Sequence, residues 1–164
     1  MGYCEQSDII ADSSTAIPGA KLYHFGVLNS DMHMAWVRHV CGRLKSDFRY
    51  SNEIVYNNFP WPEVEAKQEA AIAAAAQDIL DARAPFLANG RDTLATIYDP
   101  DTMPRSLVDA HAVLSRLVDR AYAQRRAFAS DRERMEVLLS RYTEMIGRQQ
   151  TIAETVPQRG RRRL

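Results

Sequence analysis

The strongest constraint on the fold is a helical repeat of apolar residues in the second half of the chain. From Pro104 to Tyr122, apolar side chains recur every three or four residues, with charged side chains between them. This period is typical of a helix that buries one face. The buried face is predicted to contain Leu107, Ala110, His111, Leu114, Leu117, Val118, Ala121 and Tyr122. The solvent-facing side is predicted to contain Arg105, Asp109, Arg116, Asp119 and Arg120.

A second helix is predicted to begin near Pro62, because proline is tolerated in a first helical turn. It should end near Ala84, because Pro85 disfavours the helical conformation of the residue before it. Its small alanine face would let a neighbouring helix approach closely. That face is predicted to contain Val64, Ala71, Ile72, Ala75, Ile79 and Ala82.

A last helix is predicted after Ser130, which forms a capping-box pair with Glu133 and so satisfies free backbone N–H groups. Gly147 is expected to end it. Three amphipathic helices with short connections predict a small antiparallel helical bundle over residues 62–147. Residues 148–164 are expected to be a basic flexible tail. The predicted apolar face of the last helix contains Met135, Leu138, Leu139, Tyr142, Met145 and Ile146.

The first part of the chain, residues 1–61, has a mixed pattern. The segments "AKLYHFGVL" and "NEIVYNNF" are β-prone, and Asn29 or Ser30 can cap a helix between them. A strand, a helix and a strand cannot easily close a core alone, so this short mixed α/β segment is expected to be the remnant of a larger domain. The fold class is therefore predicted to be mainly α.

Charge and composition give no global indication of a partner, since 21 Lys and Arg residues balance 21 Asp and Glu residues. Cys4 and Cys41 are too few and too far apart for a disulfide scaffold. No apolar run approaches the roughly 20 residues that a membrane span needs. The first residues lack the pattern of a secretory signal, so a cytoplasmic chain without a membrane partner is expected.

Metal binding and catalysis find little support in the sequence. His33 and His39 lie six residues apart, about 240° around a helix, and therefore diverge. Packing and local hydrogen bonds are the expected roles of the histidines. The sequence contains no HExxH or CxxC spacing, glycine-rich phosphate loop or nucleophile elbow. No metal site and no catalytic residue are therefore assigned.

A cluster of basic residues lies between Arg38 and Arg49, with only Asp47 as a counter-charge. On the predicted helix, Arg38 and Lys45 point away from the side that carries Trp36. Such donors suit DNA phosphates, although a short charge cluster can also be an ordinary solvated face. The candidate DNA-binding residues are Arg38, Arg43, Lys45, Arg49, Tyr50, Ser51, Asn57 and Asn58.

The segment "YHFGVLNSDMHMAWVRHVCGRLKSDFRYSNEIVYNNFPWP" resembles a segment of the MmeI-like enzymes. These are single-chain type II restriction–modification proteins with an adenine-N6 DNA methyltransferase, a target recognition domain and a helical C-terminal domain. "ILDARA", "LATIYDPDTMP", "LVDAHAVLSRLVDRAY" and "DRERMEVLLSRY" are similar to the terminal region in the same order. The resemblance covers about residues 22–142.

The resemblance implies a C-terminal fragment, in which residues 1–61 end the target recognition domain and residues 62–147 form the helical domain. The NPPY-type catalytic motif is absent, so S-adenosylmethionine is expected for the parent enzyme and no cofactor for this chain. Arg43, Lys45, Arg49 and Tyr50 are then candidates to face the DNA backbone. The base of the recognition domain is expected to contain Phe25, Val27, Leu28, Trp36 and Val55.

Two functions follow as hypotheses. The first is a non-catalytic DNA-recognition and scaffold segment of a restriction–modification methyltransferase, with double-stranded DNA as its partner. The second is a purely structural or protein-interaction module. Its helices would dock on a methyltransferase or nuclease domain, and the methyltransferase domain would belong to the same chain or to a separate one.

Overall fold

The computed structural model describes residues 1–4, 9–11, 15–45, 47–123 and 128–155, and helices dominate it. The mainly helical fold class is confirmed. The elements are α1 (Leu22–Leu28), α2 (Asp31–Val40), β1 (Gly42–Leu44), β2 (Asp47–Arg49), the π-helix η1 (Asn52–Tyr56), α3 (Ala66–Leu87), α4 (Leu94–Ile97), α5 (Arg105–Ala123) and α6 (Asp131–Thr155). In the described parts of the chain, no helix is long and apolar enough to cross a bilayer.

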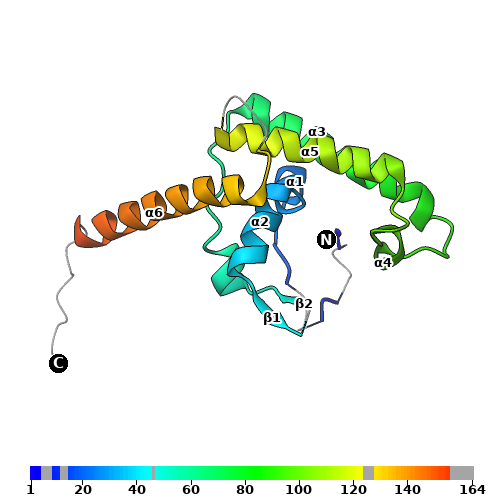
Figure 1. Ribbon diagram of the computed structural model, residues 1–164, viewed down its shortest axis with the longest axis horizontal. Coiled ribbons are helices and arrows are strands. Elements are labelled where there is room, and N and C mark those ends of the chain that lie inside the picture. The colour runs from blue at the N-terminus through cyan, green and yellow to red at the C-terminus, as the bar shows by residue number, and fades with distance from the viewer. Residues whose placement is uncertain (5–8, 12–14, 46, 124–127, 156–164) are drawn as a thin grey trace.

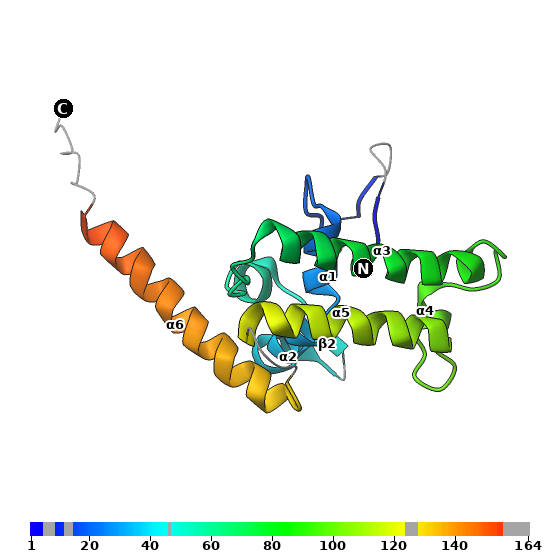
Figure 2. The same cartoon turned by 90° about the horizontal axis from the view of Figure 1, so that it is seen from above.

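Helices α3 and α5 lie side by side and antiparallel, and α1 packs across them (Figures 1 and 2). The contact between α1 and α3 is close because Gly26 faces the small side of α3. A Cβ atom added to Gly26 would lie 2.9 Å from Cγ2 of Ile72 and 3.2 Å from Cβ of Ala76. The close approach of a neighbouring helix to the alanine face is therefore confirmed.

Helix α6 packs mainly against α2, and its C-terminal half extends away from the other helices (Figures 1 and 2). Its buried apolar residues Met135 and Leu138 lie near its N-terminal end, whereas Leu139, which was predicted to be buried, is 50% exposed. The ring of Tyr142 lies 5.6 Å from that of Trp36 on α2. The three predicted helices are therefore present, but only α3 and α5 form an antiparallel pair, and α6 packs on α2 instead.

Both strands predicted in residues 1–61 are wrong. Residues 22–28 form α1, and residues 52–56 form η1, so the strand-helix-strand order is replaced by helices and a small hairpin. A short apolar run is compatible with a buried strand and with a buried helix turn, and periodicity alone does not separate them. The real strands β1 and β2 are exposed throughout and lack an apolar alternation. Of the two predicted caps, Asn29 and Ser30, the structure has Ser30 at the N-cap of α2, where its side chain accepts a hydrogen bond from the backbone N–H of His33.

Three predicted helix ends also differ from the structure. Helix α3 begins after its N-cap Glu65 rather than near Pro62. It ends at Leu87 rather than near Ala84, so Pro85 lies within its last turn. Helix α6 continues past Gly147, so residues 148–155 of the predicted flexible tail are helical. Pro85 lacks one backbone N–H but lies in the last turn of α3, and Gly147 keeps its N–H and only weakens a helix, so neither residue need stop it earlier. Residues 156–164 of the predicted tail lie outside the described residues.

A strap, residues 57–63, begins with a turn after η1, leads toward α3 and is held by two tyrosine hydroxyls. Tyr122 donates to the carbonyl of Pro60 at 2.9 Å, and Tyr23 donates to the carbonyl of Pro62 at 3.3 Å. The ring of Trp61 contacts several neighbouring aromatic rings. The residues expected at the base of the recognition domain are all buried, as that role would require: Phe25, Val27, Leu28, Trp36 and Val55.

Candidate nucleic-acid interface

The basic cluster of the sequence lies largely on a short antiparallel hairpin, β1–β2. The register pairs Gly42 with Arg49, Arg43 with Phe48 and Leu44 with Asp47. Every described residue of the hairpin is exposed, and in Figure 1 the hairpin lies below α2, on the side away from α3 and α5. The hairpin is therefore an accessible basic projection from the helical core.

Lys45 follows β1 directly and has a φ of 58°, in the left-handed region. The favoured two-residue hairpin turns need such positive φ values, because their twist matches that of the strands they join. Because Leu44 and Asp47 are the last paired residues, Lys45 lies in the turn at the tip of the hairpin.

The two arginines of the hairpin lie on opposite faces. Because side chains alternate across a strand, Arg43 and its cross-strand partner Phe48 share one face, while Arg49 shares the other with Leu44. The guanidinium of Arg43 lies over the ring of Phe48, 4.4 Å from its centroid. Positive charge is thus presented on both faces and at the tip, rather than on a single flat surface.

Arg38 lies apart from the hairpin cluster, in the last turn of α2. Its Nη1 lies 2.6 Å from Oδ2 of Asp131 on α6. The prediction that Arg38 and Lys45 project from one helix is wrong, because α2 ends at Val40. Arg38 is therefore already paired with a carboxylate.

The polar candidates beside the hairpin have mostly structural contacts. The Tyr50 hydroxyl lies 3.1 Å from Nε2 of His33, and burial raises the pKa of Tyr50 to about 12. Ser51 caps η1 by accepting from the backbone N–H of Ile54. Nδ2 of Asn58 donates to two carbonyls of the same turn, at 2.7 and 3.1 Å. Asn57 is exposed and lines a groove.

That groove, of about 360 Å³, lies between the strap and α6. The ring of Trp61 and the side chain of Met145 line it, with Arg141 among the polar residues of its wall. An exposed ion pair bridges the same two segments, with 3.1 Å between Nη1 of Arg148 and Oε1 of Glu63. The sequence did not indicate this groove, because its two sides are far apart in the chain: the ion-paired residues Glu63 and Arg148 are separated by 85 positions.

The histidines make local contacts, as predicted. His39 Nδ1 lies 2.8 Å from the carbonyl of Ala35, and His24 Nδ1 accepts from the backbone N–H of Lys21 at 3.0 Å. His111 Nε2 lies 2.6 Å from the hydroxyl of Tyr98. Within the described residues, no group of three or more His, Cys, Asp or Glu side chains is placed to hold a metal ion.

Two buried polar clusters were missed by sequence reasoning. Asp119, predicted to face solvent, is 1% exposed and accepts two hydrogen bonds from the guanidinium of Arg134. Arg83, on α3, is 3% exposed and donates to the hydroxyl of Tyr98 and to the carbonyl of Met1. A charged residue within an amphipathic pattern carries no signal of its partner, so neither cluster was predictable from the spacing.

Comparison with known families identifies the chain. The family model "MmeI, target recognition domain" matches residues 1–63, and "MmeI, C-terminal domain" matches residues 64–149. The chain therefore belongs to the MmeI family, and it combines residues of these two domains. The two matches meet at the end of the strap, between residues 63 and 64.

Two relatives are much longer than this chain, which matches only part of each. The chain is 44% identical over 148 residues to DNA methyltransferase A of Bacillus subtilis (strain 168). These aligned residues are 90% of this chain and 16% of that protein. It also resembles a solved structure of the type IIL restriction–modification enzyme MmeI in complex with DNA. There the TM-score is 0.74 and the identity 41%, over 80% of this chain and 17% of that one. The chain thus spans about a sixth of the length of these relatives.

Proposed function

We propose that this chain is a non-catalytic DNA-recognition and scaffold segment of a restriction–modification DNA adenine-N6 methyltransferase. The observation that carries the proposal is the exposed hairpin with Arg43, Lys45 and Arg49, within the residues that match a target recognition domain. The similar MmeI structure was solved in complex with DNA, which agrees with a DNA partner.

The hairpin has the physical properties that a phosphate contact needs. Its three basic side chains project from exposed backbone, and their charges are on both faces and at the tip. A two-stranded ribbon is narrow enough to enter the major groove of B-DNA, where its two faces would meet the phosphates on either side. Contacts of this kind position a protein on the duplex and depend strongly on salt.

The rest of the parent protein would perform the methyl transfer. We place S-adenosylmethionine there, and we assign no cofactor to this chain. The methyltransferase portion, in the same or a separate polypeptide, is then the proposed protein partner. Duplex DNA and that partner would be met in the cytoplasm, which is the location we propose.

The salt dependence of DNA binding tests the proposal. The affinity of the chain for a short mixed-sequence duplex should fall as salt rises, with a log–log slope of about −0.9 per phosphate contacted. The triple variant Arg43→Gln, Lys45→Gln and Arg49→Gln should flatten that slope by up to about 2.7. Glutamine removes the positive charge, keeps a polar and flexible side chain, and leaves the backbone demand at residue 45 unchanged.

A matched control removes three exposed arginines elsewhere, with Arg91→Gln, Arg105→Gln and Arg132→Gln. It has the same net charge as the hairpin variant, so it measures the general effect of lost charge. Equal slopes for the two triple variants would contradict a DNA-facing hairpin.

A second candidate function is a protein-interaction module that docks on a methyltransferase or nuclease domain. Exposed apolar side chains favour it, since Leu44 is 68% and Ile54 56% exposed near the hairpin. The groove beside α6 offers a further apolar surface. Stable binding to a separately produced methyltransferase domain, without DNA binding by the chain alone, would support this function over the first.

A further inference from the structure

We propose that Arg38 is a positioning residue, which acts on DNA binding through Asp131 and not by touching a phosphate. Its ion pair belongs to a polar network that holds the hairpin-bearing helix α2 on the C-terminal helices. This inference rests on the proposed function of the hairpin.

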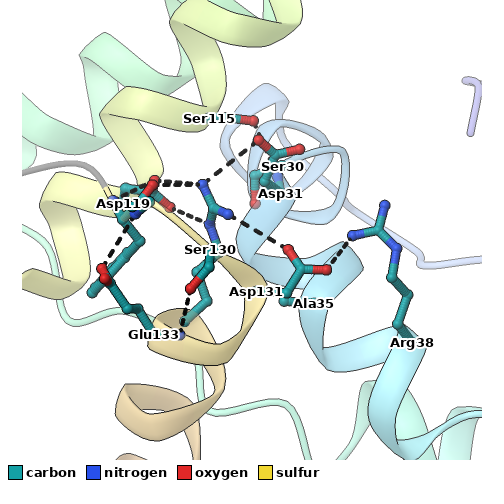
Figure 3. A network of polar contacts seen from close by, with 12 residues as sticks. Ser30, Asp31, Ala35, Arg38, Ser115, Asp119, Ser130, Asp131 and Glu133 are labelled. Carbon is teal, nitrogen blue, oxygen red and sulfur yellow. Dashed lines mark hydrogen bonds and ion pairs between the residues drawn. The ribbon is translucent and has the colours of Figure 1, made fainter.

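The network begins at the surface and continues inward across α6. Nη1 of Arg38 donates to Oδ2 of Asp131 at 2.6 Å. The other carboxylate oxygen, Oδ1, lies 3.5 Å from Nη1 of Arg134, one turn further along α6. Figure 3 shows Asp131 turned toward Arg38, with Asp119 on the opposite side of the network. Asp131 therefore connects an exposed cation to a buried one.

The inner end of the network is fixed in the core. Arg134 donates from Nε and Nη2 to the two carboxylate oxygens of Asp119, at 3.1 and 2.9 Å. Asp119 also accepts from the backbone N–H of Phe128 at 3.2 Å. Asp31, in the first turn of α2, lies 3.7 Å from Nη2 of Arg134. The network thus joins both ends of α2 to α5 and α6, across the two family matches.

Helix α2 is in turn the base on which the hairpin stands. Only Cys41 separates the end of α2 from the beginning of β1. The chain that leaves the hairpin is tied back to α2, because Tyr50 bonds His33 and Nε1 of Trp36 donates to the carbonyl of Val55 at 3.0 Å. A shift of α2 on the C-terminal helices would therefore carry the hairpin with it.

Two roles for Arg38 make opposite predictions for Asp131. If Arg38 meets a phosphate, Asp131 competes for its guanidinium, and loss of that carboxylate should tighten binding and steepen the salt slope. If Arg38 acts by holding α2, loss of either partner weakens binding, and loss of Asp131 weakens it at least as much as loss of Arg38, because Asp131 also lies beside Arg134. In that case the slope stays as in the wild type, because no phosphate contact is lost.

The experiment is a double-mutant cycle in the full chain, with Arg38→Ala, Asp131→Asn and the double variant. Duplex affinity is measured across a range of salt. The exposed pair on α5 supplies controls for the simple change of charge, with Arg105→Ala and Asp109→Asn. We expect each single network variant to weaken binding about twofold to fivefold beyond its control, which is the range for a partly exposed pair. The double variant should bind no more weakly than Asp131→Asn alone, because that single variant already breaks the Arg38 pair.

Tighter binding with a steeper slope for Asp131→Asn would overturn the inference. So would additive losses, or a slope that falls by about 0.9 for Arg38→Ala alone. These results would leave the proposed function intact, since the hairpin triple variant tests it separately.

A second measurement does not depend on DNA. Backbone amides of α2 should exchange hydrogen faster in both single network variants than in the α5 controls, because the helix is held less firmly. Unchanged exchange would overturn the inference. If the wild-type chain binds no DNA at all, the proposed function fails, and the exchange rates alone decide whether the network holds α2.

Discussion

Asp119 and Arg134 form a bidentate ion pair in the interior, with carboxylate and guanidinium atoms 2.9 and 3.1 Å apart. The side chain of Asp119 is 1% exposed and that of Arg134 is 10% exposed. A buried pair of this kind contributes modestly as a whole, because desolvation offsets much of the attraction, but losing one partner leaves a costly unpaired charge. Packing of α6 therefore depends on both residues together.

Asp119→Asn should destabilise the chain by about 3 kcal/mol, because it leaves the buried guanidinium of Arg134 without its main partner. This value is at the lower end of the range for a broken buried pair, since two other carboxylates remain near Arg134. Urea unfolding followed by tryptophan fluorescence measures the loss. The control Asp109→Asn breaks an exposed pair and should cost between about 0 and 1 kcal/mol. Similar losses in the two variants would contradict a dominant role for the buried pair.

Gly26→Ala should destabilise the chain by about 1–3 kcal/mol, since the new methyl group would meet Ile72 and overpack the α1–α3 contact. The nearest backbone atom, the carbonyl oxygen of Ile72, would lie 3.2 Å away, so side-chain movement cannot relieve the whole contact. Gly147→Ala is the matched control, because apart from its chain neighbours and its own helix backbone, no atom of the described residues lies within 4 Å of the methyl group that it would gain. There the usual gain in helix stability, about 0.5–1 kcal/mol, should appear. Thermal unfolding distinguishes the two, and a stabilising Gly26→Ala would refute the close-contact argument.

The parts of the fold that the sequence predicted well have a long, regular period. Residues 105–123 form α5 almost as predicted, and Leu107, Leu114 and Val118 are fully buried. Nineteen residues offer five helical turns over which a buried face can repeat, so the signal is averaged. Seven residues of α1 offer only two turns, and an apolar run of that length is equally compatible with a buried strand.

The candidate site was predictable as a group of residue types but not as a geometry. The cluster of Arg43, Lys45 and Arg49 was visible in the sequence. The hairpin that places Arg43 and Arg49 on opposite faces was not visible, because each strand has only three residues, all exposed, and so shows no apolar alternation. Arg38 belonged to the same cluster in sequence but pairs with Asp131, 93 residues away. A contact between such distant residues depends on how α6 packs, and charge spacing contains no information about that.

Tyr98→Phe should destabilise the chain by about 1–3 kcal/mol, the range for leaving a buried donor without its acceptor. Arg83 donates to the Tyr98 hydroxyl from Nε at 2.8 Å and also from Nη2, and no carboxylate pairs with Arg83 among the described residues. Thermal unfolding measures the effect. Tyr56→Phe, at a half-exposed ring on η1, should change stability by less than about 0.5 kcal/mol. Equal effects would mean that the guanidinium does not depend on this hydroxyl.

His33 should make the stability of the chain depend on pH in the mildly acidic range. Burial lowers the pKa of His33 from its usual 6.5 to about 4, and its Nδ1 has no hydrogen-bond partner in the described structure. Between these two values the unfolded chain binds a proton that the folded chain does not, so stability is complete above pH 6.5 and declines as the pH falls toward 4. From pH 7 to pH 5 this residue alone should remove about 2 kcal/mol from the free energy of unfolding.

His33→Leu isolates that contribution, because leucine fills a similar buried volume and cannot bind a proton. The pKa of His111 is also lowered, mainly by burial and secondly by the positive charge of Arg83. Because His111 is present in the wild type and in His33→Leu, its contribution cancels when the two declines in stability are compared. Tyr50→Phe removes the hydroxyl beside His33 and keeps the buried imidazole. It should lower the free energy of unfolding at both pH values, without reducing the decline in that free energy from pH 7 to pH 5. Urea unfolding at pH 7 and pH 5 then gives a smaller decline for His33→Leu than for the wild type and for Tyr50→Phe. An equal decline in all three proteins would show that the acid sensitivity of the fold arises from other groups than this imidazole.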